Sequence, residues 1–150
     1  MRVILQRVSE ASVTISDQVH GKINQGLLIL VGIETADTPE DIEWLAKKIV
    51  NLRIFSDSEG LMNFSLIDIK GELLVISQFT LHAKTKKGNR PSYIHAARPE
   101  VAIPLYEKFI QKLEELSSVK VATGIFGADM KVSLINDGPV TIIIDSKSRA

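Results

Sequence analysis

The residues best suited to chemistry stand at the end of one apolar run. The segment Leu73–Leu81 reads Leu-Leu-Val-Ile-Ser-Gln-Phe-Thr-Leu, so a strand-forming stretch finishes in Ser77, Gln78, Phe79 and Thr80. Hydroxyl groups and free backbone N–H groups at a strand end can bind an anion or polarise a carbonyl group. Periodicity alone favours a simpler interpretation, a core strand whose polar side chains alternate outward.

Basic residues follow this strand directly. No acidic residue lies between Glu72 and Glu100, and the basic residues of that interval are Lys84, Lys86, Lys87, Arg90 and Arg98. The whole chain is neutral, with 18 basic and 18 acidic residues. Any attraction for a polyanion must therefore come from this local excess. Charge alone favours an ordinary solvated loop, and the alternative is a loop that faces phosphate groups.

The segment Asn136–Thr141, which reads Asn-Asp-Gly-Pro-Val-Thr, is also unusual. Because proline cannot donate a backbone hydrogen bond, Pro139 marks a turn or the start of a strand. Only about one X-Pro bond in twenty is cis in folded proteins, so the local sequence favours an ordinary trans turn at Gly138–Pro139.

Several common kinds of site are absent from the sequence. Neither G-x-G-x-x-G nor G-x-x-x-x-G-K occurs, which excludes Rossmann and P-loop nucleotide sites. The chain has no cysteine, and His20, His82 and His95 are not spaced as zinc ligands. No G-x-S-x-G occurs either, so a Ser-His-Asp triad cannot be assigned. We therefore expect no metal and no cofactor, and interpret His82 and His95 as surface side chains.

Short runs rich in valine and isoleucine predict that strands dominate the fold. The predicted strands are Arg2–Val8, Ala11–Ile15, Leu27–Ile33, Leu52–Phe55, Leu66–Ile69, Leu73–Phe79, Lys120–Ile125, Val132–Ile135 and Val140–Ile144.

Two segments have the apolar spacing of helices. One has Thr38 as its N-cap and Pro39 at its first position, and its apolar stripe extends to Ile49. The other has an apolar face from Val101 to Leu116, although Pro104 should delay or kink its start.

These elements predict a strand-rich α+β fold, with a curled, mostly antiparallel sheet or barrel-like layers and about two covering helices. We expect residues 1–150 to form one domain, Trp44 to be partly buried at the sheet edge, and Ser146–Ala150 to fray. The longest apolar stretch, Gly26–Ile33, is too short to cross a membrane, and the first residues lack a signal-peptide pattern. A soluble cytoplasmic protein is therefore expected.

The chain resembles the D-aminoacyl-tRNA deacylases of the bacterial and eukaryotic type over nearly its full length. The two central motifs are Ser77-Gln-Phe-Thr-Leu81 and Asn136-Asp-Gly-Pro-Val-Thr141. The other matching pieces are Gln6-Arg7-Val8, Ala11–Thr14, Arg53–Asp57, Gly60, Met62-Asn63, Arg90-Pro-Ser92, Gly124, Phe126, Ala128–Met130 and Val132–Leu134. Both motifs together, in order and with these flanks, are highly specific.

The resemblance implies a cytoplasmic homodimer that hydrolyses the ester of D-aminoacyl-tRNA and also removes glycine mischarged onto tRNA for alanine. It implies that Ser77–Thr80 form the pocket floor and that a cis Gly138–Pro139 peptide enters the partner's site as a chirality screen. Arg7 matches the arginine that orients this peptide. Phe126 and Met130 match residues near the adenosine and the aminoacyl group.

This resemblance gives the weaker signals a common chemical interpretation. Backbone N–H groups near Gln78, Phe79 and Thr80 would stabilise the oxyanion of an already activated ester, so no strong nucleophile is needed. We expect the neighbouring ribose hydroxyl to assist water, while Thr80 binds or polarises the ester. The cations Lys84, Lys86, Lys87 and Arg90 would contact tRNA phosphates. The alternatives are a nucleic-acid-binding module without turnover and a conventional serine or threonine esterase.

Overall fold

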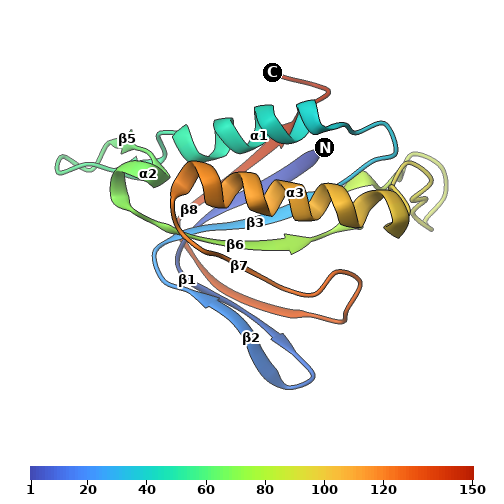
Figure 1. The fold of residues 1–150 in the computed structure, drawn as a ribbon, viewed down its shortest axis with the longest axis horizontal. Coiled ribbons are helices and arrows are strands. Elements are labelled where there is room, and N and C mark those ends of the chain that lie inside the picture. The colour runs from blue at the N-terminus through green and yellow to red at the C-terminus, as the bar shows by residue number, and fades with distance from the viewer.

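A mixed β-sheet forms the centre of the structure, a computed structural model that describes residues 1–150 (Figure 1). Its strands are β1 (Arg2–Ile15), β2 (Gln18–Ile23), β3 (Gly26–Gly32), β6 (Glu72–Ser77), β7 (Val121–Thr123) and β8 (Lys131–Asp145). The strand order is β2-β1-β3-β6-β7, and β8 also pairs with β1. A separate two-stranded sheet consists of β4 (Phe55–Ser56) and β5 (Met62–Phe64).

The middle of the large sheet is parallel. The β1 strand pairs with β2, β3 and β8 in antiparallel fashion, whereas β3–β6 and β6–β7 are parallel pairs. Parallel strands are usually covered on both faces, which fits the almost uninterrupted burial of β3 and β6. The expected strand-rich α+β fold is confirmed, and the barrel-like sheet is mixed. Because β3 and β6 are parallel and Val31 pairs with Ser77, both strands end at the same edge.

Two long helices lie side by side over one face of the sheet (Figure 1). The first, α1 (Pro39–Asn51), begins where predicted, and the Asp41 carboxylate accepts a hydrogen bond of 2.8 Å from the Thr38 N–H. The second, α3 (Pro99–Ser117), begins five residues before Pro104. The expectation that Pro104 delays this helix is therefore wrong: the helix begins at Pro99, a proline at the first helical position, where a missing N–H costs no helical bond, and it continues through Pro104.

The helices and the sheet enclose the main core. It contains 23 buried residues, with Phe55, Phe109, Leu45 and Leu73 among the fully buried ones. A smaller cluster of seven residues, which includes Val13, Leu28 and Ile76, fills the other side of the sheet. No helix is long and apolar enough to cross a membrane.

Several predicted elements differ from the structure. Leu66–Ile69 forms the short helix α2, not a strand, because Ser65 and Asp68 cap each other's backbone N–H groups. Leu52–Phe55 is mostly irregular, and only its last residue enters a strand. The two predicted N-terminal strands are one strand, β1, and the two predicted C-terminal strands are likewise joined in β8.

The C-terminal tail is packed against α1. Ser146 is buried and donates a hydrogen bond of 2.6 Å to Asp41, and the Lys147 ammonium lies 2.9 Å from the same carboxylate. The Arg149 guanidinium lies 4.3 Å from the centre of the half-buried Trp44 ring. The expected fraying of Ser146–Ala150 is therefore wrong at these residues, and the partial burial of Trp44 is confirmed.

Candidate functional site

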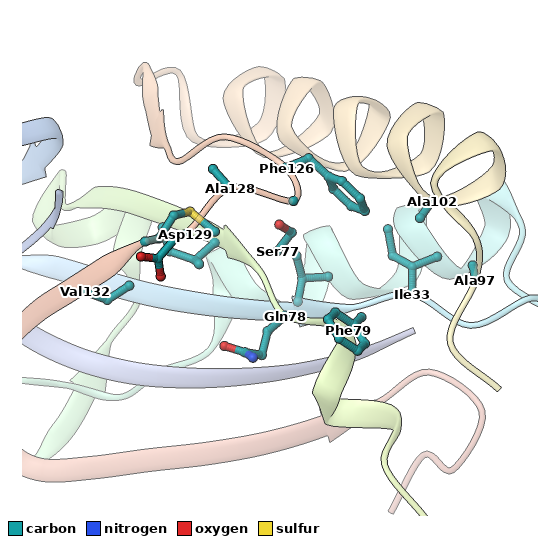
Figure 2. A pocket seen from close by; sticks show the side chains of 14 residues that line it. Ile33, Ser77, Gln78, Phe79, Ala97, Ala102, Phe126, Ala128, Asp129 and Val132 are labelled. Atoms are coloured by element: carbon teal, nitrogen blue, oxygen red, sulfur yellow. The ribbon is translucent and has the colours of Figure 1, made fainter. Parts of the chain in front are cut away.

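A cavity of about 300 Å³ lies where β3 and β6 end (Figure 2). The strand ends form its floor, the β7–β8 connection forms one wall, and residues at and just before the start of α3 form another. Ten of its fourteen lining residues are hydrophobic. The lining residues are Val31, Ile33, Ile76, Ser77, Gln78, Phe79, Ala97, Ala102, Phe126, Gly127, Ala128, Asp129, Met130 and Val132. An apolar cavity with a few polar groups is the usual form of a small-ligand site.

The polar groups of the floor belong to a tight turn that follows β6. This 3-10 turn, η1 (Phe79–His82), begins with a Leu81 N–H donating to Gln78 O at 3.2 Å. The N–H of Gln78 is already used, since it donates to Val31 O at 2.7 Å. The N–H groups of Phe79 and Thr80 precede the first bond of the turn and therefore have no partner within it. They are the two donors that the turn leaves for a ligand.

The Thr80 hydroxyl is held by the neighbouring amide. The Gln78 Nε2 donates to Thr80 Oγ1 at 2.5 Å. No histidine or carboxylate forms a hydrogen bond with Thr80 Oγ1 or Ser77 Oγ. Neither hydroxyl therefore has the adjacent base that activates a serine or threonine nucleophile.

The η1 turn is fixed from behind by three contacts. A Cβ atom on Gly32 would lie 2.9 Å from Leu81 Cβ, so only glycine lets β3 approach the turn this closely. The Arg2 Nη1 donates to Leu81 O at 2.7 Å. His82 is buried, and its Nδ1 lies 3.6 Å from a Glu34 carboxylate oxygen. The expectation of a surface His82 is therefore wrong: the side chain lies beneath the turn.

The opposite wall is aromatic and apolar. The Phe126 ring packs against Tyr106 with 5.8 Å between the ring centres, and Tyr106 donates to Val75 O at 3.1 Å. Burial raises the pKa of Tyr106 to about 12, so its phenol stays protonated and keeps this bond at neutral pH. Met130 completes the wall, packed so closely on Gly124 that a Cβ there would collide with its sulfur.

The second motif forms an exposed corner within β8. The Gly138–Pro139 bond is cis, as the resemblance implied, and both residues are exposed. Gly138 has a φ of +136°, a backbone conformation that favours glycine. Arg7 binds the preceding residue, with its Nε donating to Asp137 O at 2.9 Å. Its Nη1 donates to Ile54 O at 2.8 Å, so one guanidinium ties the corner to the segment before β4.

This corner does not line the cavity of its own chain. The strand register joins Ser77 to Val31 and Val31 to Val3, while Gly138–Pro139 faces the Arg7 end of β1. Neither Gly138 nor Pro139 is among the residues that line the cavity. The structure thus brings Ser77, Gln78, Phe79, Phe126 and Met130 together, with Thr80 beside them. Arg7, Gly138 and Pro139 lie elsewhere.

The basic residues are gathered in one exposed loop between η1 and α3. Its base is closed by backbone bonds between Lys84 and Ser92, of 2.8 and 3.0 Å. Lys84, Lys86, Lys87 and Arg90 are all exposed, and none forms an ion pair. Phe79 before the loop and Ala97 after it both line the cavity. The charge excess therefore lies beside the cavity mouth.

Sequence reasoning missed part of the cavity wall. Ala97 and Ala102 line it, although neither belongs to a pattern that indicates chemistry. Asp129 also lines it, and the sequence analysis gave this residue no role. The sequence motif around Ala128–Met130 was the only signal that pointed to Asp129. No group of three or more histidine, aspartate or glutamate side chains is placed to hold a metal ion.

Comparisons with known proteins agree on one family. The family model described as D-Tyr-tRNA(Tyr) deacylase matches residues 4–145. A Flavobacterium psychrophilum protein named D-aminoacyl-tRNA deacylase is 66% identical over 149 residues, which is 99% of each chain. A Bacteroides thetaiotaomicron protein of the same name is 62% identical over the same length and coverage.

Solved structures show the same fold. A chain described as c-Myc DNA Unwinding Element Binding Protein is 38% identical, with a TM-score of 0.92 and complete coverage of both chains. A probable eukaryotic D-amino acid tRNA deacylase has a TM-score of 0.83 at 17% identity. It covers 95% of this chain and 97% of its own, and at this identity the likeness concerns the fold alone.

Proposed function

Because the chain belongs to the D-Tyr-tRNA(Tyr) deacylase family, we propose that its cavity holds the aminoacyl end of the substrate and that a partner's Gly138–Pro139 corner screens chirality. The enzyme is a hydrolase that acts on D-aminoacyl-tRNA. The residue roles, the cytoplasmic homodimer and the removal of glycine from tRNA for alanine are parts of the proposal. The observation that carries it is the η1 turn, in which the N–H groups of Phe79, a lining residue, and of the adjacent Thr80 have no partner within the turn.

The chemical step depends on charge stabilisation. The N–H groups of Phe79 and Thr80 bind the carbonyl oxygen of the ester as it becomes an oxyanion, and each such donor contributes about 10²- to 10³-fold to kcat. Water is the nucleophile, assisted by the ribose hydroxyl beside the ester. Thr80 orients the ester, since its hydroxyl has only the Gln78 amide as a partner. Trapping an acyl group on Thr80 during turnover would contradict this mechanism.

The chirality screen follows from where the corner lies. In its own chain neither corner residue lines the cavity, so the proposal has a second protomer supply the corner. Its exposed backbone, held by Arg7, then faces the α-carbon of the amino acid. A D-side chain points outward, whereas an L-side chain drives its Cβ into backbone. Glycine has no Cβ, so glycyl-tRNA is also accepted.

Subunit complementation tests the composite site directly. One variant, Gly32→Ala, has a displaced floor and an intact corner, since the added Cβ would lie 2.9 Å from Leu81 Cβ in the η1 turn. The other, Gly138→Ala, has an intact floor and a damaged corner, since the added Cβ would lie 3.0 Å from Arg7 Nη2. The two are co-expressed with different tags, and the mixed dimer is purified by both tags.

The mixed dimer should contain one complete site and regain about half of the wild-type activity on D-tyrosyl-tRNA, with wild-type rejection of L-tyrosyl-tRNA. Each homodimeric variant, purified in the same way, is the matched control. A mixed dimer no better than its parents would contradict a corner supplied in trans.

The basic loop is proposed to bind tRNA phosphates. Its four cations lack ion pairs and lie beside the cavity mouth, where the acceptor end of the substrate must enter. Binding through such contacts weakens with salt and depends little on sequence. One relative is named for DNA binding, so duplex DNA is the competitor to include. Equal binding of duplex DNA and of tRNA would indicate that the loop adds only general affinity.

A further inference from the structure

Two exposed aromatic rings stand at the mouth of the cavity. Phe79 is 55% exposed and Tyr93 is 38% exposed, although rings of this size usually lie buried. Their centres are 5.1 Å apart, and the rings meet edge to face at 78°. Phe79 belongs to the cavity lining, on the side where Ile33 and Ala97 also lie (Figure 2). Tyr93 lies outside the lining, and the proposed chemistry gives it no role.

The surroundings of Tyr93 are basic. Tyr93 follows Ser92, whose backbone pairs with Lys84 at the base of the basic loop. In Figure 1 this loop, drawn in yellow, lies at the end of the molecule where α3 begins. The aromatic pair therefore lies between the cavity and four unpaired cations. Exposed aromatic rings next to a positive groove are the combination that binds single-stranded nucleic acid.

We propose that Tyr93, with Phe79 beneath it, stacks against the penultimate base of the tRNA acceptor end. This inference rests on the proposed function, which puts the terminal adenosine and its amino acid at the cavity. The next nucleotide is single-stranded and must leave past the mouth, where Tyr93 is the exposed ring and the loop offers cations to its phosphate.

A second copy of the chain is a poorer occupant of this surface. In a symmetric dimer, a residue that meets its own counterpart lies at the axis, and any other contact is made twice between two different patches. If the Tyr93 patch met its own counterpart, two basic loops would come together with no acidic residue between Glu72 and Glu100 to balance them. Like charges brought together across an interface oppose association. An RNA strand is favoured because its phosphates match the sign of the loop.

The central experiment is a double-mutant cycle with one change in the protein and one in the RNA. Tyr93→Leu is compared with wild type on D-tyrosyl-tRNA, and both are assayed on the same tRNA with an abasic penultimate nucleotide, charged chemically. Loss of stacking should raise KM about 5- to 150-fold and change kcat little. On the abasic substrate, wild type should lose the same factor, and Tyr93→Leu should lose nothing more. If the abasic nucleotide and Tyr93→Leu each raised KM independently, so that their two factors multiplied, the proposal would be overturned.

Controls separate stacking from damage to the fold. Tyr93→Phe keeps the ring and should retain wild-type KM. Phe64→Leu removes another exposed aromatic ring, on β5 and outside the cavity lining, and should change nothing. On D-tyrosyl-adenosine, which has no penultimate base, Tyr93→Leu should equal wild type. Slower hydrolysis of this short ester would show that Tyr93 acts on the cavity and would overturn the proposal.

The remaining outcomes are also decisive. If Tyr93→Leu converts a dimer into a monomer by light scattering, the patch is a protein interface and the proposal fails. Failure of the proposed function would appear elsewhere, as a mixed dimer of floor and corner variants that does not recover activity. The stacking cycle uses neither of those variants, so the two results are independent.

Discussion

The substitution Gly32→Ala tests whether the η1 turn sets the rate. The added Cβ would lie 2.9 Å from Leu81 Cβ and 3.0 Å from both Gln78 O and His82 Cδ2. Carbon atoms in contact normally lie about 3.5–4.0 Å apart. Because two of these neighbours are a backbone oxygen and a Cβ, no side-chain rotation relieves the clash. The turn must move away from β3 by about 0.5–1 Å.

The expected losses follow from this movement. Overpacking of a filled interior costs about 1–3 kcal/mol in the free energy of unfolding. The bond from the Gln78 N–H to Val31 O, 2.7 Å long, would stretch, and the N–H groups of Phe79 and Thr80 would move with it. Misplacing a catalytic group by about 1 Å can cost about 10²-fold in rate. We therefore expect single-turnover hydrolysis of D-tyrosyl-tRNA to slow by about 10- to 100-fold.

Gly71→Ala is the matched control, because it also crowds a buried glycine. Its Cβ would meet Leu66 Cδ1 at 2.8 Å and Ile69 Cδ1 at 3.1 Å, the movable ends of two side chains beyond the opposite end of β6. Urea unfolding should show a smaller loss, and the single-turnover rate should stay at the wild-type value. The reasoning is refuted if Gly32→Ala is folded and fully active, or if both variants lose the same rate.

Three further predictions concern other parts of the molecule. Arg7→Lys keeps the charge but cannot hold two carbonyl groups with one planar fork, so kcat/KM for D-tyrosyl-tRNA should fall about 10- to 100-fold and discrimination against the L-ester should weaken. Burial alone would raise the pKa of Asp41, but hydrogen bonds from Ser146, Thr38 and Lys147 hold it below its usual range. The carboxylate therefore stabilises the fold at neutral pH, and this stabilisation is lost as the pH falls below about 4. In urea unfolding, Asp41→Asn should lower the free energy of unfolding by about 1.5–3 kcal/mol at pH 7. The free energy of unfolding of this variant should also fall less than that of wild type as the pH falls below about 4. Replacing Lys86, Lys87 and Arg90 by glutamine should reduce the slope of log affinity for tRNA against log salt by about one for each phosphate that the loop no longer neutralises, whereas an unchanged slope would place the RNA elsewhere.

The sequence predicted the floor of the site better than its walls. Ser77–Thr80 follow an apolar strand, and local order alone puts them at its end. Ala97 and Ala102 reach the same cavity only because α3 packs over the sheet, a tertiary contact that no local pattern encodes. The sequence motif pointed to Gly138–Pro139, and the family resemblance implied that its peptide bond is cis. Only the structure shows that neither corner residue lines the cavity of its own chain.

The errors in secondary structure have equally specific causes. A short apolar run such as Leu66–Ile69 fits a strand or one helical turn, and the reciprocal capping by Ser65 and Asp68 was the signal that distinguishes them. The proline at position 139 suggested a break between two strands, yet pairing with β1 continues on both sides of it. The buried position of His82 depends on Gly32 and Glu34, which no periodicity connects to it.

The β8 strand has a consequence for how this protein can vary. Its fifteen residues begin beside the cavity wall at Val132 and carry the Gly138–Pro139 corner farther along. Side chains alternate along a strand, so inserting or deleting one residue between these points would turn the following side chains to the opposite face. The number of residues between Val132 at the cavity wall and Gly138 at the corner is therefore constrained. Insertions are therefore better tolerated in the exposed loops than between these two points of β8.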